Sequence, residues 1–288
     1  MGKIFQMNRI VELVKTSRPI SWVNTAYPFS AGYIVVSGQL NWFWLVATVY
    51  FLIPYNLLMY GINDVFDYES DLQNPRKGGI EGAVTERSLH RTIIWSSLLL
   101  GLPFLIYMVS QTSWQASLWL VFVLFMVIAY SAPKLRFKER PFLDSATSSI
   151  HFVGPLIYGL IVLGWRADFW PYVVAFFLWG MASHAFGAVQ DIEADRKGKI
   201  ASIGTIMGAK WTTRFSLLLY VLCAGLLVLQ GRQTWAIGLC ALLYAANAAP
   251  YYNLPDKDCE VANAGWHRFI WLNFITGAVV TISLILII

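Results

Sequence analysis

The chain gathers many of its carboxylates in two short clusters, although only 16 Asp and Glu occur in 288 residues. One cluster is Asn-Asp-Val-Phe-Asp-Tyr-Glu-Ser-Asp at 63–71, and the other is Gln-Asp-Ile-Glu-Ala-Asp at 190–195. Two unit charges about 4 Å apart repel each other by about 4 kcal/mol at an effective dielectric of about 20. Such clusters therefore require a cation. Hard oxygen ligands suit Mg²⁺, which takes further oxygens from substrate phosphates, so the clusters predict a diphosphate held through magnesium.

The spacing within each cluster brings its polar side chains together. Residues four apart share one face of a helix, so Asn63, Asp67 and Asp71 are predicted to form one stripe. Asp191 and Asp195 form a second stripe in the same way. A solvated helix end explains one such stripe, but it does not explain two in a chain this poor in acidic residues.

The composition identifies the elements that position these stripes as membrane helices. The chain is 57% hydrophobic and 13% charged, whereas a soluble domain carries about 25% charged residues. Apolar runs reach spanning length with their flanks. They predict an all-α, multi-pass integral membrane bundle that forms a single domain over residues 1–288. The nine predicted spans are 22–36, 43–60, 93–109, 118–130, 152–165, 172–189, 215–229, 236–249 and 269–288.

The distribution of basic residues predicts the orientation of this bundle. Of the 21 Lys and Arg residues, all but Arg166 and Arg232 fall in segments on one side when the N-terminus is cytoplasmic. This bias follows the positive-inside rule and places both acidic clusters at the cytoplasmic face of the plasma membrane. Residues 1–18 fit an interfacial amphipathic helix. The net charge of +5 thus reflects topology and gives no sign of nucleic-acid binding.

Basic residues accompany the acidic clusters on the predicted cytoplasmic side. Arg76 and Lys77 follow the first cluster, and Lys134 and Arg136 follow Tyr130 in the loop after the fourth span. Phosphate oxygens that no metal binds need Lys or Arg donors, so these residues are candidates for holding a diphosphate. The positive-inside bias is an equally good explanation for each of them taken singly.

Both stripes continue into the membrane. Asn56 and Tyr60 extend the first stripe, and polar or small residues extend the second. We predict that these positions border a cavity for an acceptor, although close helix packing is the stronger explanation for the small residues. His184 also lies on the second stripe, and a histidine at such a position is more often an interior residue with satisfied hydrogen bonds than a catalytic base. The positions on the second stripe are Gly180, His184, Gly187 and Ala188.

The two motifs resemble the paired aspartate-rich motifs of the UbiA superfamily of intramembrane prenyltransferases. The stretches 17–29 and 61–82 are similar to the lycopene elongase branch of that superfamily. The resemblance implies a nine-helix fold and a Mg²⁺-dependent enzyme. It also implies that C5 units from dimethylallyl diphosphate are added to the ends of lycopene in C50 carotenoid biosynthesis.

The resemblance also implies roles for individual residues. Asn63, Asp67 and Asp71 would bind one Mg²⁺ with support from Asp64, and Asp191 and Asp195 would bind the other. The four aspartates at 67, 71, 191 and 195 are the expected catalytic carboxylates. The expected diphosphate contacts are Lys77, Lys134 and Arg136, with Arg76, Tyr130 and Arg18 nearby.

Two alternatives remain open from the sequence. A UbiA-type enzyme with an aromatic acceptor, such as 4-hydroxybenzoate, a naphthoate or a chlorophyllide, would carry the same motifs. A divalent-cation transporter is a different class, and it needs acidic residues along a path through the membrane. The nine predicted spans contain no acidic residue, and the two acidic clusters lie just beyond the inside ends of the second and sixth, which argues against transport.

Overall fold

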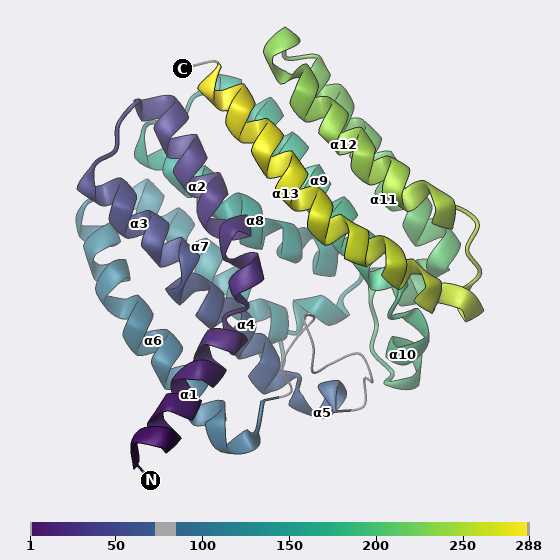
Figure 1. Cartoon of the computed structure of the whole chain (residues 1–288), viewed down its shortest axis with the longest axis horizontal. Helices are drawn as coiled ribbons and strands as arrows, with labels where there is room; N and C mark the ends of the chain where they lie inside the picture. The colour runs from purple at the N-terminus through teal and green to yellow at the C-terminus, as the bar shows by residue number, and fades with distance from the viewer. Residues whose placement is uncertain (1, 73–84, 287–288) are drawn as a thin grey trace. The chain divides into compact units, whose positions relative to one another are not determined.

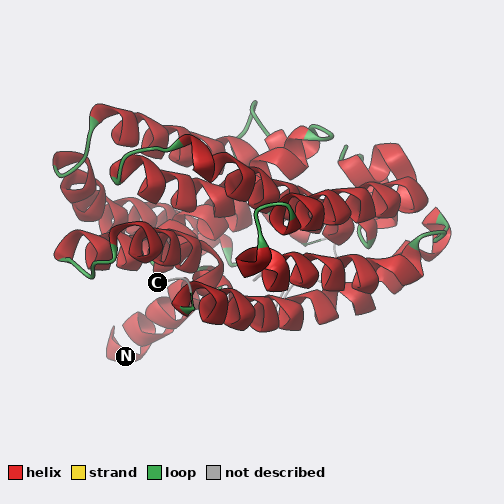
Figure 2. Cartoon of the chain, turned by 90° about the horizontal axis from the view of Figure 1, so that it is seen from above, coloured by secondary structure: helices red, strands yellow, loops and turns green. Residues whose placement is uncertain are grey.

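The computed structural model of the chain describes residues 2–72 and 85–286. All regular secondary structure in these residues is helical, and no strand occurs among them (Figure 2). The predicted all-α class is therefore confirmed for the described part. The chain divides into two compact units. Unit 1 comprises Met1–Arg136 with Gly154–Gly164, and unit 2 comprises Phe137–Val153 with Trp165–Ile288.

The helices follow one another along the chain as Figure 1 labels them. The α-helices of unit 1 are α1 (Gly2–Thr16), α2 (Trp22–Ser37), α3 (Trp42–Leu52), α4 (Pro54–Phe66), α5 (Tyr68–Asp71), α6 (Arg87–Ser110) and α7 (Trp114–Ser131). Helix α8 (Leu143–Val162) begins in unit 2 and ends in unit 1. The later α-helices, all in unit 2, are α9 (Trp170–Val189), α10 (Ile192–Lys197), α11 (Ile203–Val228), α12 (Trp235–Ala248) and α13 (Asn263–Ile285). Short 3-10 helices are η1 (Pro19–Ser21), η2 (Phe137–Glu139), η3 (Ala167–Phe169), η4 (Arg232–Thr234), η5 (Ala249–Tyr251) and η6 (Asp256–Ala262).

Each predicted span overlaps one of these helices, except that the second falls on the consecutive pair α3 and α4. Among the described residues, seven helical stretches are long and apolar enough to cross a membrane, so the chain is an integral membrane protein. Helices α2 and α12, with 16 and 14 residues, are shorter than these stretches. The count of nine spans and the orientation remain predictions.

A proline divides the second predicted span into α3 and α4. Pro54 has no backbone N–H to donate, so α3 ends at Leu52 and α4 begins afresh. The buried Asn56 side chain compensates, because its Nδ2 donates to the carbonyl oxygens of Phe51 (2.9 Å) and Leu52 (3.0 Å). Thr25 Oγ1 also donates to Phe51 O. This arrangement gives Asn56 a structural role; the acceptor-cavity role remains a prediction.

Helix α8 begins well before the predicted span 152–165, and this difference brings a carboxylate into a membrane helix. Asp144 lies in its first turn and is completely buried. Its Oδ1 accepts from the Ser145 amide (2.6 Å) and its Oδ2 from the Ile203 amide (2.7 Å). Both amides lie at helix starts, where N–H groups lack intrahelical acceptors. Asp144 therefore satisfies two helix N-termini, which is a structural role and not that of an ion path.

Candidate active site

The first acidic cluster lies at a break between two helices of unit 1. Helix α4 ends at Phe66, Asp67 forms the junction, and α5 follows. The Asp67 amide still donates to the Asn63 carbonyl (2.9 Å), so the four-residue register between these residues is kept across the break. Asp71 closes α5, but its side chain lies outside the described part of the structure. The predicted stripe is thus supported from Asn63 to Asp67, although the helix that carries it is not continuous.

An arginine from the start of the chain pairs with this cluster. Arg18 Nη2 donates to Asp64 Oδ1 (2.8 Å), and the Asp64 side chain has no exposed surface. The Arg18 guanidinium also lies 4.3 Å from the centre of the Tyr60 ring. A buried carboxylate is stable as a charge only when it is paired. Arg18 supplies that partner for Asp64, and Tyr60 supports Arg18 through its ring face.

The loop after α7 supplies a second arginine. Arg136 Nη2 lies 3.6 Å from Asp67 Oδ1, and the Asp67 side chain is only 3% exposed. Lys134 and Arg136 both have positive φ angles, 73° and 38°. Such strain in residues other than glycine costs about 1–3 kcal/mol and clusters at ligand sites. Two of the predicted diphosphate contacts thus lie in a strained loop, and one of them faces the acidic cluster.

Three further predicted diphosphate contacts are Tyr130, Arg76 and Lys77. Tyr130 is half-buried in the last turn of α7. Arg76 and Lys77 lie outside the described residues. Their roles, like that of Asp71, remain predictions.

Ser131 is a residue of this site that the sequence did not indicate. It is buried at the end of α7, and its Oγ accepts a hydrogen bond from Asn63 Nδ2 (3.0 Å). This bond occupies the amide nitrogen of Asn63 and so fixes which way its carbonyl oxygen, the predicted metal ligand, is directed. Partners of this kind orient ligands at metal sites. The sequence signal that could have identified Ser131 was its position next to Tyr130, a predicted diphosphate contact.

Ser131→Ala is expected to weaken Mg²⁺ activation about 10- to 100-fold, because Asn63 loses the group that orients it. Activity measured against Mg²⁺ concentration tests this expectation. Ser131→Thr keeps the hydroxyl and should restore most of the affinity. Equal Mg²⁺ dependence in Ser131→Ala and the unmodified chain would show that Ser131 has no part in the site.

The second cluster also lies at a helix break, in unit 2. Helix α9 ends at Val189, and α10 begins at Ile192. The Asp195 amide donates to the Asp191 carbonyl (2.8 Å), which keeps these half-buried residues in register. Ser202 Oγ donates to Asp195 Oδ2 (3.2 Å). Each cluster thus joins a membrane helix to a short helix.

The donor set in both clusters fits magnesium. Among the described residues, no three His, Cys, Asp or Glu side chains come close enough together to form an all-protein metal cage. Mg²⁺ does not need such a cage, because one or two carboxylates, water and substrate phosphates usually complete its six positions. The oxygen donors Asn63, Asp67, Asp191 and Asp195 have the chemistry for that kind of binding.

The small residues predicted to border an acceptor cavity make close packing contacts. A Cβ on Gly180 would lie 2.3 Å from Ser149 Oγ, and one on Gly187 would lie 2.9 Å from the Trp266 ring. The Ala188 carbonyl packs against Gly204 of α11 in the same way. This geometry favours helix packing at these positions; the acceptor-cavity role remains a prediction.

The histidine on the same face has a partner of its own. His184 Nδ1 lies 3.0 Å from Ser145 Oγ, next to the buried Asp144. This contact agrees with the expectation of an interior histidine whose hydrogen bonds are satisfied. His184 therefore contributes to the joining of α8 and α9.

Gly187→Leu is expected to destabilise unit 2 by about 1–3 kcal/mol, because its side chain meets the Trp266 indole. Thermal unfolding of the protein in detergent or lipid tests this. Gly187→Leu/Trp266→Ala makes room and should recover part of the loss. If Gly187→Leu is as stable as the unmodified chain and blocks only the use of the acceptor, the cavity role is supported over packing.

Comparison with known proteins agrees with the motifs. Residues 25–275 match the model of the UbiA prenyltransferase family. The lycopene elongase/hydratase of Corynebacterium glutamicum is 50% identical over 281 residues, which cover 97% of this chain and 98% of that protein. The C(50) beta-cyclic carotenoids biosynthesis protein LbtBC of Dietzia sp. (strain CQ4) is 48% identical, over 94% of this chain and 64% of its own length. The predicted resemblance to the lycopene elongase branch is confirmed.

Solved structures share the fold at low sequence identity. A UbiA homologue from Aeropyrum pernix K1 superposes with a TM-score of 0.69 at 16% identity, covering 94% of this chain and 98% of that one. A UbiA homologue from Archaeoglobus fulgidus, bound to DMAPP and Mg²⁺, gives a TM-score of 0.65 at 17% identity, covering 92% and 99%. These likenesses show the shared fold, and the family match together with the 50% identity to the Corynebacterium glutamicum protein shows that the chain belongs to the UbiA prenyltransferase family.

Proposed function

We propose that this chain is a lycopene elongase, which transfers C5 units from dimethylallyl diphosphate to the ends of lycopene with Mg²⁺ as cofactor. The observation that carries the reaction class is the pairing of the buried Asp64 and Asp67 with Arg18 and Arg136 at the end of a membrane helix. The choice of acceptor is supported by the lycopene elongase/hydratase matched over 98% of its length and by the carotenoid biosynthesis protein matched over 64% of its length. The distribution of Lys and Arg supports a site on the cytoplasmic face of the plasma membrane.

The two clusters would hold the metal. Asn63, Asp67 and Asp71 would bind one Mg²⁺, supported by Asp64, and Asp191 and Asp195 would bind the other. When bound, the metal neutralises negative charge on the diphosphate. The diphosphate oxygens that no metal binds would contact Lys77, Lys134 and Arg136, with Arg76, Tyr130 and Arg18 nearby.

The side chains of the first cluster then have distinct tasks. Arg136, at 3.6 Å from Asp67, exchanges this carboxylate for phosphate oxygens when the diphosphate enters. Its charge matches the negative charge that grows on the leaving group, which is where fixed charges lower a barrier most. Arg18 remains with the buried Asp64 and holds the end of α4 in place.

The chemistry proceeds by breaking a C–O bond and forming a C–C bond. Diphosphate leaves with the electron pair, and the terminal double bond of lycopene attacks the dimethylallyl cation. The tertiary cation that results either loses a proton or adds water and then releases a proton, and diphosphate is a sufficient acceptor for the proton in both cases. Water would quench the first cation, so apolar surroundings favour transfer.

Expression of the chain in a lycopene-accumulating host tests the proposal. We expect C45 and C50 carotenoids that are absent from the host alone, and none with an Asp67→Asn/Asp191→Asn variant. The main alternative is an aromatic acceptor, such as 4-hydroxybenzoate, a naphthoate or a chlorophyllide. Unchanged lycopene together with a prenylated aromatic product would favour that alternative.

A further inference from the structure

Helix α11 is interrupted at Gly208, close to the second acidic cluster. Gly208 has a φ of 72°, in the left-handed region that favours glycine. In an unbroken helix, the Ala209 amide would donate to the Thr205 carbonyl. Here it donates to Asp256 Oδ1 instead (2.7 Å), and a Cβ on Gly208 would lie 2.8 Å from that oxygen. Glycine is thus needed for both the backbone angle and the approach of Asp256.

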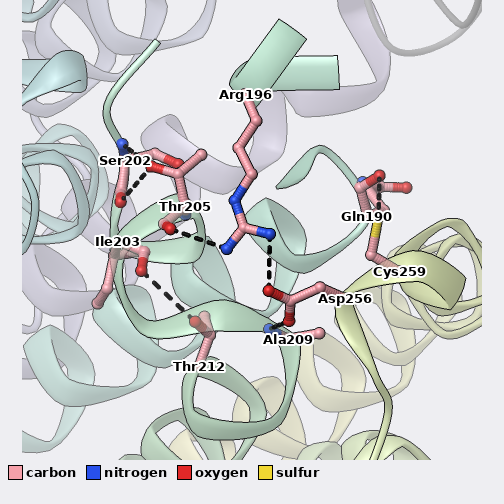
Figure 3. A network of polar contacts seen from close by, with 9 residues as sticks. All are labelled: Gln190, Arg196, Ser202, Ile203, Thr205, Ala209, Thr212, Asp256 and Cys259. Carbon is pink, nitrogen blue, oxygen red and sulfur yellow. Dashed lines mark hydrogen bonds and ion pairs between the residues drawn. The ribbon is translucent and has the colours of Figure 1, made fainter. Parts of the chain in front are cut away.

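Two side chains of opposite charge replace the missing helical bond (Figure 3). Arg196 Nη2 donates to the Thr205 carbonyl (3.1 Å), while Asp256 accepts from the Ala209 amide. Arg196 Nη1 also lies 2.7 Å from Asp256 Oδ2. Both backbone groups left by the break are therefore satisfied, and the groups that satisfy them pair with each other.

The Arg196–Asp256 pair is also connected to the second acidic cluster. Arg196 follows Asp195 directly in α10. Ser202, the N-cap of α11, donates to Asp195 Oδ2 and accepts from the Thr205 amide (3.3 Å). Asp195 is thus held between α10 and the first turn of α11, and the pair fixes these two segments to each other.

We propose that Arg196 and Asp256 are positioning residues that fix Asp195 for the binding of a divalent cation. The inference rests on the proposed function of the second cluster. An exposed ion pair alone contributes little to stability. This pair differs, because losing either member leaves a backbone group at the α11 break without its partner and loosens α10.

The first test is cation binding with two single variants. Mn²⁺ is titrated in the presence of inorganic diphosphate, and unbound Mn²⁺ is measured by electron paramagnetic resonance. Arg196→Ala and Asp256→Asn are each expected to weaken binding about 10- to 100-fold, the range for loss of a residue that orients a metal ligand. Asp256→Asn keeps an oxygen that can accept from the Ala209 amide. Any loss of Mn²⁺ binding in this variant therefore reports the negative charge that holds Arg196.

Further variants separate positioning from general damage. The double variant Arg196→Ala/Asp256→Asn should lose little more than either single one, because residues that act as a pair are not additive. Arg196→Lys keeps the charge and should lie between Arg196→Ala and the unmodified chain. Hydrogen exchange over residues 190–201 should accelerate in Arg196→Ala. Arg214→Ala is the matched control, since Arg214 bonds Asn253 and Tyr252 outside this network.

The outcomes distinguish the inference from the function on which it rests. If Asp195→Asn weakens Mn²⁺ binding while Arg196→Ala and Asp256→Asn bind normally, the positioning role is wrong and the proposed function stands. If Asp195→Asn also binds Mn²⁺ normally, the cation-binding role of the second cluster fails, and the inference fails with it.

Discussion

Asp67→Asn and Asp191→Asn are each expected to lower prenyl transfer by at least about 10²- to 10³-fold, with the protein still folded in the membrane. Each change removes one negative charge and keeps the size of the side chain. Losses of this size are typical when one contact to developing charge is removed, and here a proposed metal ligand is lost as well. Turnover of labelled dimethylallyl diphosphate by each purified variant measures the effect.

The control for these variants is Asp168→Asn. Asp168 is an exposed carboxylate that pairs with Arg166, outside both clusters, and its replacement should leave turnover unchanged. EDTA should inhibit the unmodified chain, and Mg²⁺ should restore activity. Full turnover by Asp67→Asn/Asp191→Asn would contradict the two-metal account.

Arg136→Ala is expected to raise the KM for the prenyl diphosphate and also to lower kcat. Its contact should tighten as the leaving group gains charge, so the loss is not confined to ground-state binding. Lys134→Ala should act in the same direction but less strongly, because Lys134 is exposed whereas Arg136 is half-buried beside Asp67. Steady-state kinetics over a range of diphosphate concentrations separate the two parameters.

Arg140→Ala serves as the control for this loop, because Arg140 is exposed and its guanidinium lies over the Phe137 ring. It should retain the kinetics of the unmodified chain. If Arg136→Ala and Lys134→Ala do so too, the basic residues of the loop would reflect only the positive-inside bias.

The sequence was sufficient for the features that depend on local spacing. The apolar runs placed every predicted span except the second on one helix, and the four-residue spacing kept Asn63 with Asp67 and Asp191 with Asp195. Both features follow from helix periodicity, which the sequence displays directly.

The features that depend on distant partners were not predictable. The breaks after Phe66 and Val189 carry no proline or glycine at the junction. Asp144 escaped notice because its acceptor role involves Ile203, far along the chain. For Gly187 the sequence favoured close helix packing, but it could not show that the packing partner is the Trp266 ring. In each case the physical cause is a tertiary contact that spacing does not reveal.

The most direct test of the central claim is transfer of label from dimethylallyl diphosphate to lycopene by the purified chain in lipid vesicles. The reaction is run with Mg²⁺, with EDTA, and with 4-hydroxybenzoate offered beside lycopene. The account predicts Mg²⁺-dependent label in C45 and C50 products, none with EDTA, and none on the aromatic acid. Label on 4-hydroxybenzoate with lycopene unchanged, or transfer that persists in EDTA, would contradict it.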